Sequence, residues 1–210
     1  DVLSDVLKRP GYSAGDTLKL ILPFLKAYGV TDSQMKEFST QNLVLIAGSR
    51  DTLQYVKAIA SVFIVSTSYE HYIKALCKAL DFPYGNTFCT HLSIDKYRLT
   101  EPERSRLKEM AGEIAQMPLV NIPPMARSLK DFSTTDQETI SRLDTIFWNE
   151  MASMTVSKIF SEVTPVGGSQ KAEAIKNVVK RLRARLEDVM YVGDSITDVE
   201  AFKLVRDNGG

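Results

Sequence analysis

The chain has 210 residues, of which 44% are hydrophobic and 25% are charged, a composition typical of globular proteins and not of disordered ones. Its 26 lysines and arginines balance its 26 aspartates and glutamates, so no net charge attracts nucleic acid or an anionic membrane. No apolar run approaches the ~20 residues that a membrane-spanning helix needs, and charges interrupt residues 1–10, where a signal peptide would be apolar. We therefore expect a cytoplasmic protein without nucleic-acid partners or direct membrane insertion.

The first part of the chain, residues 1–42, is predicted to be helical. Apolar residues recur at helical spacing from Leu18 to Leu25, and a short polar helix is expected after Thr31.

From residue 43 the pattern changes to an alternation of helices and apolar runs. A helix is expected over residues 49–60 and another over residues 69–80. Between them, residues 62–65 are four apolar residues without polar alternation. A strand that is apolar on both faces belongs inside a parallel sheet covered by helices. Residues 43–90 are therefore predicted to form part of an α/β core with a Rossmann-like parallel sheet.

Residues 91–162 interrupt this alternation, because they contain helical patterns and no apolar strand signal. Thr100 and Glu103 match a capping box at the start of one of these helices. We interpret the stretch as an inserted helical subdomain. The alternation returns in residues 163–210, which are predicted to complete the core with an apolar strand at residues 189–192.

Hydroxyl groups follow the first predicted strand. In parallel sheets ligands bind at the carboxyl ends of the strands, and Ser66, Thr67 and Ser68 come directly after residues 62–65. With the free amides of the next helix they could form a phosphate site. The alternative is that Ser66 or Ser68 only caps that helix.

Two aspartates follow the second predicted strand. Asp194 is expected at the tip of the strand and Asp198 one helical turn later, so both carboxylates could face one Mg²⁺ ion. Alternatively, Asp198 belongs to a capping box with Ser195. That alternative leaves unexplained the charge of Asp194 directly after a buried strand.

A lysine is expected in the first turn of a late helix. Lys171 follows Gly167 and Gly168, where the positive end of the helix dipole disfavours a cation. The lysine is therefore either solvated or faces an anion.

In this order the three features resemble motifs two, three and four of the haloacid dehalogenase-like phosphohydrolases, with a phosphoserine-phosphatase-like core. The matching residues are Ser66 in FIVSTSY, Lys171 in GGSQKAEAI, and Asp194 and Asp198 in VGDSITDVEAF. The resemblance implies a phosphatase that uses Mg²⁺ and an aspartyl-phosphate intermediate on a small phosphorylated metabolite. It implies that Ser66 and Lys171 contact phosphate, that Asp194 binds the metal, and that Asp198 holds a metal water or orients Lys171.

The nucleophile of this family lies in a DxD motif after the first strand, and no DxD follows an apolar strand before Ser66. We expect that motif upstream of Asp1, with residues 1–42 and 91–162 as caps over the site. The alternative is a domain that has lost catalysis. A third hypothesis is an α/β domain whose acids are only helix caps.

Two further stretches, GYSAGDTLKLILPFLKAYGV and FIVSTSYEHYI, resemble an archaeal family of subunits R of energy-converting hydrogenase A. This resemblance implies a hydrogenase complex as a possible partner and a non-catalytic accessory subunit as the alternative function.

Overall fold

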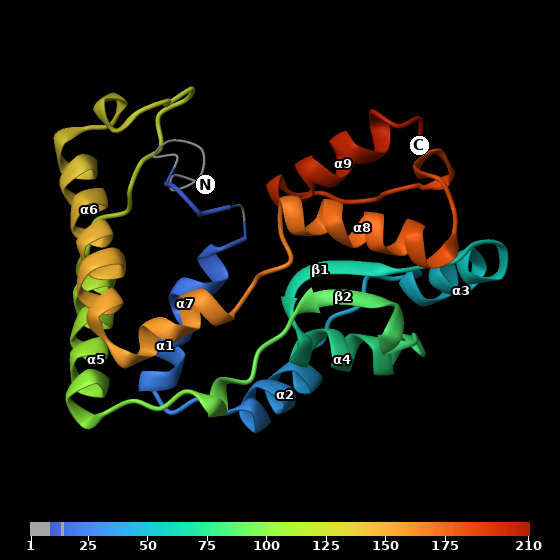
Figure 1. The fold of residues 1–210 in the computed structure, drawn as a ribbon. Coiled ribbons are helices and arrows are strands. Elements are labelled where there is room, and N and C mark those ends of the chain that lie inside the picture. The colour runs from blue at the N-terminus through green and yellow to red at the C-terminus, as the bar shows by residue number, and fades with distance from the viewer. Residues whose placement is uncertain (1–8, 14) are drawn as a thin grey trace. The chain divides into compact units, whose positions relative to one another are not determined.

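A computed structural model describes residues 9–13 and 15–210 of the chain (Figure 1). They divide into two compact units: a helical unit, with the described residues up to Val30 and Ser93–Val163, and an α/β unit, with Thr31–Leu92 and Thr164–Gly210. The helical unit holds α1 (Thr17–Ala27), α5 (Glu101–Gln116), α6 (Thr134–Thr145) and α7 (Lys158–Glu162). The α/β unit holds α2 (Asp32–Gln41), α3 (Ser49–Ile59), β1 (Ile64–Tyr69), α4 (Glu70–Leu80), β2 (Thr87–Thr90), α8 (Ser169–Leu182) and α9 (Val199–Arg206).

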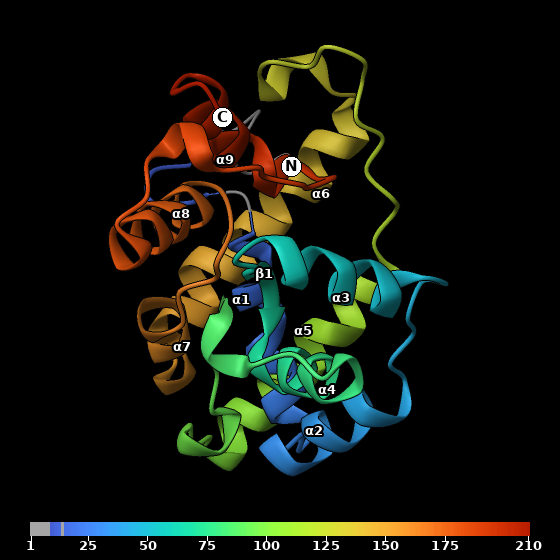
Figure 2. The ribbon, with the colours of Figure 1, turned by 90° about the vertical axis from the view of Figure 1, so that its right-hand side faces the viewer.

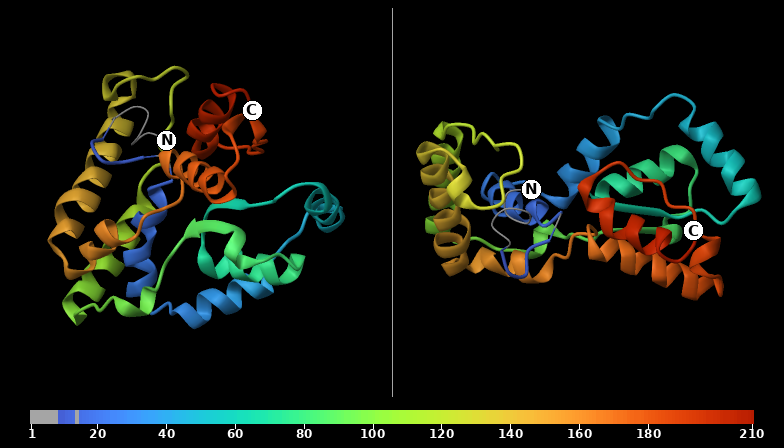
Figure 3. Two further views of the ribbon diagram at one scale, coloured as in Figure 1. Left: turned by 45° about the vertical axis from the view of Figure 1, so that its right-hand side comes forward. Right: turned by 90° about the horizontal axis from the view of Figure 1, so that it is seen from above.

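In the helical unit, α1 packs against α5 and α7, and Figure 3 shows α1 beside α5. The predicted capping box is confirmed, because Glu103 N donates to Thr100 Oγ1 and the Glu103 carboxylate accepts from Thr100 N at 3.0 Å. Arg104 of the same helix donates to the carbonyl of Ala27 at 2.9 Å and so satisfies the C-terminal end of α1. None of the described helices is long and apolar enough to cross a membrane.

The α/β unit is built on a sheet of two parallel strands, β1 and β2. Ile64 pairs with Thr87 and Val65 with Phe88, and the register then shifts before Tyr69 pairs with Thr90. Helices α4 and α8 lie on opposite faces of this sheet (Figures 1 and 2). Helix α2 packs on α4 and α9 packs on α8. The described part of the chain therefore has the helix-covered parallel sheet of an α/β fold, with two strands.

The strands depart from the prediction in three ways. β1 begins and ends later than residues 62–65 and includes Ser66, Thr67 and Ser68. β2 was not predicted, because Thr87–Thr90 is short and half polar. The predicted strand at residues 189–192 is wrong for the described residues: this segment pairs with neither strand, and Met190 and Val192 are 88% and 84% exposed. An apolar sequence forms a strand only where a neighbouring strand satisfies its backbone groups.

Candidate functional site

A buried ion pair joins α8 to the turn before α9. Lys171 Nζ lies 2.7 Å from Asp198 Oδ1, and the two side chains are only 7% and 4% exposed. The residues are 27 positions apart in the sequence, so this contact depends on how α8 and α9 pack. Of the two interpretations of Lys171, the structure supports the one in which it faces an anion, and that anion is Asp198.

The carboxylate of Asp198 accepts hydrogen bonds at both oxygens. Oδ1 accepts from Lys171 Nζ and from the Tyr191 hydroxyl at 2.5 Å. Oδ2 accepts from Ser195 N at 3.1 Å and Ser195 Oγ at 2.8 Å. Burial raises the pKa of Asp198, but these donors lower it more, so that it lies well below its ordinary value of 3.8. The capping box with Ser195 is thus present together with the ion pair.

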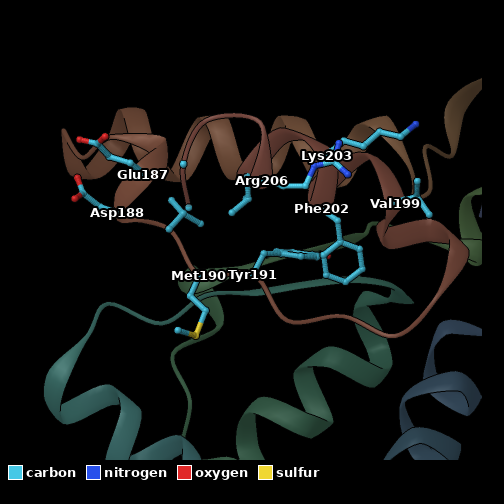
Figure 4. Close-up of a pocket in the computed structure, with 12 residues that line it drawn as sticks. Glu187, Asp188, Met190, Tyr191, Val199, Phe202, Lys203 and Arg206 are labelled. Atoms are coloured by element: carbon cyan, nitrogen blue, oxygen red, sulfur yellow. The ribbon is translucent and has the colours of Figure 1, made fainter.

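Tyr191 is a member of this cluster that the sequence analysis missed. The expected strand at residues 189–192 treats Tyr191 as an apolar residue, although a phenol in an otherwise apolar run is a usable signal. Burial and the nearby Asp198 carboxylate raise the pKa of its hydroxyl, which therefore stays protonated as a donor. Figure 4 shows Tyr191 extending toward Phe202 of α9 at the edge of a cavity of about 770 Å³.

Two glycines allow the backbone to approach this cluster closely. A Cβ on Gly193 would lie 2.6 Å from Asp198 Cγ, closer than real side chains come. Gly168 has a φ of +54°, which favours glycine, and its N–H donates to the carbonyl of Thr197 at 2.9 Å. This bond ties the loop before α8 to the turn that carries Asp198.

Thr90, at the carboxyl end of β2, connects the sheet to the loop that leads into α8. The fully buried hydroxyl donates to the carbonyl of Thr67 on β1 at 2.7 Å and accepts from Val166 N at 3.1 Å. In Figure 1 both strands point toward the end at which α8 begins. The carboxyl edge of the sheet and the start of α8 therefore meet, and the sequence analysis did not identify Thr90 as the link.

The predicted hydroxyl residues lie at this edge but inside β1. Ser66 Oγ accepts from Ser68 N at 3.2 Å. The alternative in which Ser66 or Ser68 caps α4 is wrong, because Tyr69 is the N-cap and no side chain caps the helix. No hydrogen bond joins Ser66, Thr67 or Ser68 to Lys171 among the described residues.

The two aspartates of the GDxxxD pattern have opposite environments. Asp194 is exposed and makes no hydrogen bond or ion pair within the described residues, whereas Asp198 is 3% exposed. A carboxylate accepts about four hydrogen bonds, and Asp198 already accepts four. Nowhere in residues 9–13 and 15–210 do three His, Cys, Asp or Glu side chains gather as metal ligands. Of the two aspartates of this pattern, Asp194 is the one whose carboxylate is exposed.

Comparison with known proteins shows what the chain resembles in fold and in sequence. The structure is similar to the structure of gene product AF1437 from Archaeoglobus fulgidus, with a TM-score of 0.81 and 25% sequence identity. The match covers 100% of this chain and 59% of that chain, so this chain spans somewhat more than half of the other. No curated protein matches the chain. The sequence profile of the haloacid dehalogenase-like hydrolases matches residues 49–207, and the chain therefore belongs to that family.

Proposed function

We propose that the chain is part of a Mg²⁺-dependent phosphatase that acts on a small phosphorylated metabolite through an aspartyl-phosphate intermediate. The observation that carries this proposal is the buried Lys171–Asp198 pair at the start of α8. It lies in the unit whose loop into α8 is bonded to the carboxyl edge of the sheet, where ligands of parallel α/β folds bind. Membership in a hydrolase family supports the reaction class.

Lys171 is suited to binding a phosphoryl group. Its ammonium has three N–H donors, and Asp198 is its one partner among the described residues. Asp198 fixes the position of the ammonium, and the remaining donors are free for phosphoryl oxygens. A fixed cation in a buried site stabilises the charge of a phosphoryl transition state without reorganisation. Ser66, Thr67 and Ser68 would supply further donors from β1.

Members of this family typically use Mg²⁺, which as a Lewis acid stabilises charge on phosphoryl oxygens. In our proposal Asp194 is the carboxylate that this chain contributes to the metal, because it is exposed and has no partner among the described residues. Asp198 acts on Lys171 and not on the metal, since all its acceptor sites are filled. The nucleophile is predicted to come from a DxD motif outside this sequence.

The test is Mg²⁺-dependent phosphate release from p-nitrophenyl phosphate by the full-length protein that contains this chain. We expect Lys171→Met to lower kcat about 100-fold or more, the usual effect of removing a donor to the transition state. Lys176→Met is the matched control, because Lys176 lies on the same helix with its side chain 55% exposed. Full activity of Lys171→Met would contradict the proposal.

A second experiment tests whether phosphate release depends on the metal. Asp194→Ala and EDTA should each abolish phosphate release. If the wild-type protein binds Mg²⁺ and releases no phosphate from any small phosphorylated compound tested, the phosphatase proposal fails. The accessory role in a hydrogenase complex is then favoured, and pull-down with hydrogenase subunits tests it.

A further inference from the structure

We propose that Tyr191 is a positioning residue of this site, whose hydroxyl fixes the Asp198 carboxylate and, through it, the ammonium of Lys171. The structural part of this inference stands on the contacts of the α/β unit. Its consequence for catalysis rests on the proposed phosphatase function.

Different groups bind the two oxygens of the Asp198 carboxylate. Ser195 occupies Oδ2 from within the same turn, so it orients Asp198 relative to α9. Lys171 reaches Oδ1 from α8, and the same oxygen accepts the Tyr191 hydroxyl. Tyr191 is therefore the group that determines which side of Oδ1 is left for Lys171.

Tyr191 is itself held in place by its packing against α9. Its ring meets the ring of Phe202 edge to face, with centroids 5.4 Å apart and an interplanar angle of 79° (Figure 4). A phenol has a single O–H donor, and the one on Tyr191 is directed at Asp198. Removing the hydroxyl while keeping the ring therefore leaves the packing and the charges of the ion pair unchanged and opens one side of Oδ1.

Removing the Tyr191 hydroxyl affects the position of the Lys171 ammonium and not the charges of the ion pair. Lys171 and Asp198 remain opposite charges in direct contact when Tyr191 becomes phenylalanine. The free side of Oδ1 then allows the ammonium to adopt a second position or a water molecule to enter. The ammonium protons exchange faster in that case, and Lys171 holds phosphoryl oxygens less accurately, whereas ground-state binding of the substrate changes little.

The experiment measures the Lys171 ammonium directly. In the full-length protein with ¹⁵N-labelled lysine, its NMR signal is assigned as the one that Lys171→Met removes. We expect Tyr191→Phe to speed hydrogen exchange of that ammonium about tenfold and to lower kcat about tenfold, with KM changed less than about twofold. Tyr84→Phe is the control: this half-buried tyrosine of the same unit contacts Cys89, 3.6 Å away, and should change neither quantity.

Replacement of Tyr191 by 3-fluorotyrosine provides a second variant that keeps both ring and hydroxyl. Its more acidic phenol donates more strongly to Asp198 Oδ1 and fixes the carboxylate more firmly. Hydrogen exchange of the Lys171 ammonium should therefore slow. The inference is overturned if the hydrogen-exchange rate of the Lys171 ammonium is the same in both Tyr191 variants as in the wild type. If no variant or wild-type protein releases phosphate, the proposed function fails, while the exchange measurement still decides the role of Tyr191.

Discussion

Replacing Asp198 by asparagine leaves the Lys171 ammonium buried without a counter-charge. At the observed separation of 2.7 Å, and with an effective dielectric constant of about 20, the attraction is about 6 kcal/mol. Desolvation of both ions offsets part of it, and breaking a buried pair by removing one partner typically costs about 3–5 kcal/mol. We therefore expect Asp198→Asn to lower the free energy of unfolding of the α/β unit by about 3–5 kcal/mol at pH 7.

The assay is urea-induced unfolding followed by circular dichroism, with the fluorescence of Trp148, the one tryptophan of these 210 residues, reporting on the helical unit. The pH dependence gives a further check. Because folding lowers the pKa of Asp198, its stabilising contribution is present above its ordinary value of 3.8 and is lost as the pH falls below it. The loss of stability in acid should therefore be smaller in Asp198→Asn than in the wild type.

A double-mutant cycle isolates the pair. Lys171→Met removes the buried cation, so adding Asp198→Asn to it should cost at least about 1 kcal/mol less than Asp198→Asn alone. If the two substitutions are additive within about 0.5 kcal/mol, the ion pair does not stabilise Asp198 and Lys171 as argued. The central contact of the site would then be refuted.

Three further substitutions test other contacts. Gly193→Ala places a methyl group 2.6 Å from Asp198 Cγ, and we expect a loss of about 1–3 kcal/mol in thermal unfolding and loss of phosphate release. Thr90→Val leaves the partly buried carbonyl of Thr67 and N–H of Val166 without their hydroxyl partner and should destabilise the α/β unit by about 1 kcal/mol in urea. Burial raises the pKa of Glu103, but hydrogen bonds from Thr100 and Thr155 outweigh it and lower the pKa to about 2. The stabilising contribution of the Glu103 carboxylate is therefore present above pH 4.5 and lost toward pH 2. After solvent screening we expect Glu103→Gln to lower the free energy of unfolding by about 1 kcal/mol above pH 4.5. The measurement is the melting temperature of both proteins as a function of pH.

Local signals predicted the helices well because their causes lie close together in the chain. The capping box of Thr100 and Glu103 defines the start of α5, and the late helix expected to carry Lys171 in its first turn is α8. The order of the three motifs also identified the family. Within each helix signal and within each single motif the relevant residues lie within a few positions of one another, so these local patterns do not depend on the remainder of the fold.

The strands were less predictable, because a strand depends on a neighbour that the local sequence does not specify. Thr87–Thr90 pairs with β1 although it is half polar, while the apolar residues 189–192 pair with neither strand of the described chain. The apolar pattern of residues 189–192 indicates that these side chains favour burial. The segment forms a strand only where a partner strand lies beside it.

The sequence by itself indicated helices that match α1 to α5 and α8, the hydrolase family, and the identity of the candidate residues, including Lys171 and Asp198. Only the tertiary structure decided what those residues do to each other. It placed Lys171 against Asp198 across 27 positions, added Tyr191 and Thr90, and left Asp194 exposed. The reason is physical: residue type determines whether a group can donate, accept or carry charge, but only packing brings distant groups within hydrogen-bond distance in a buried site.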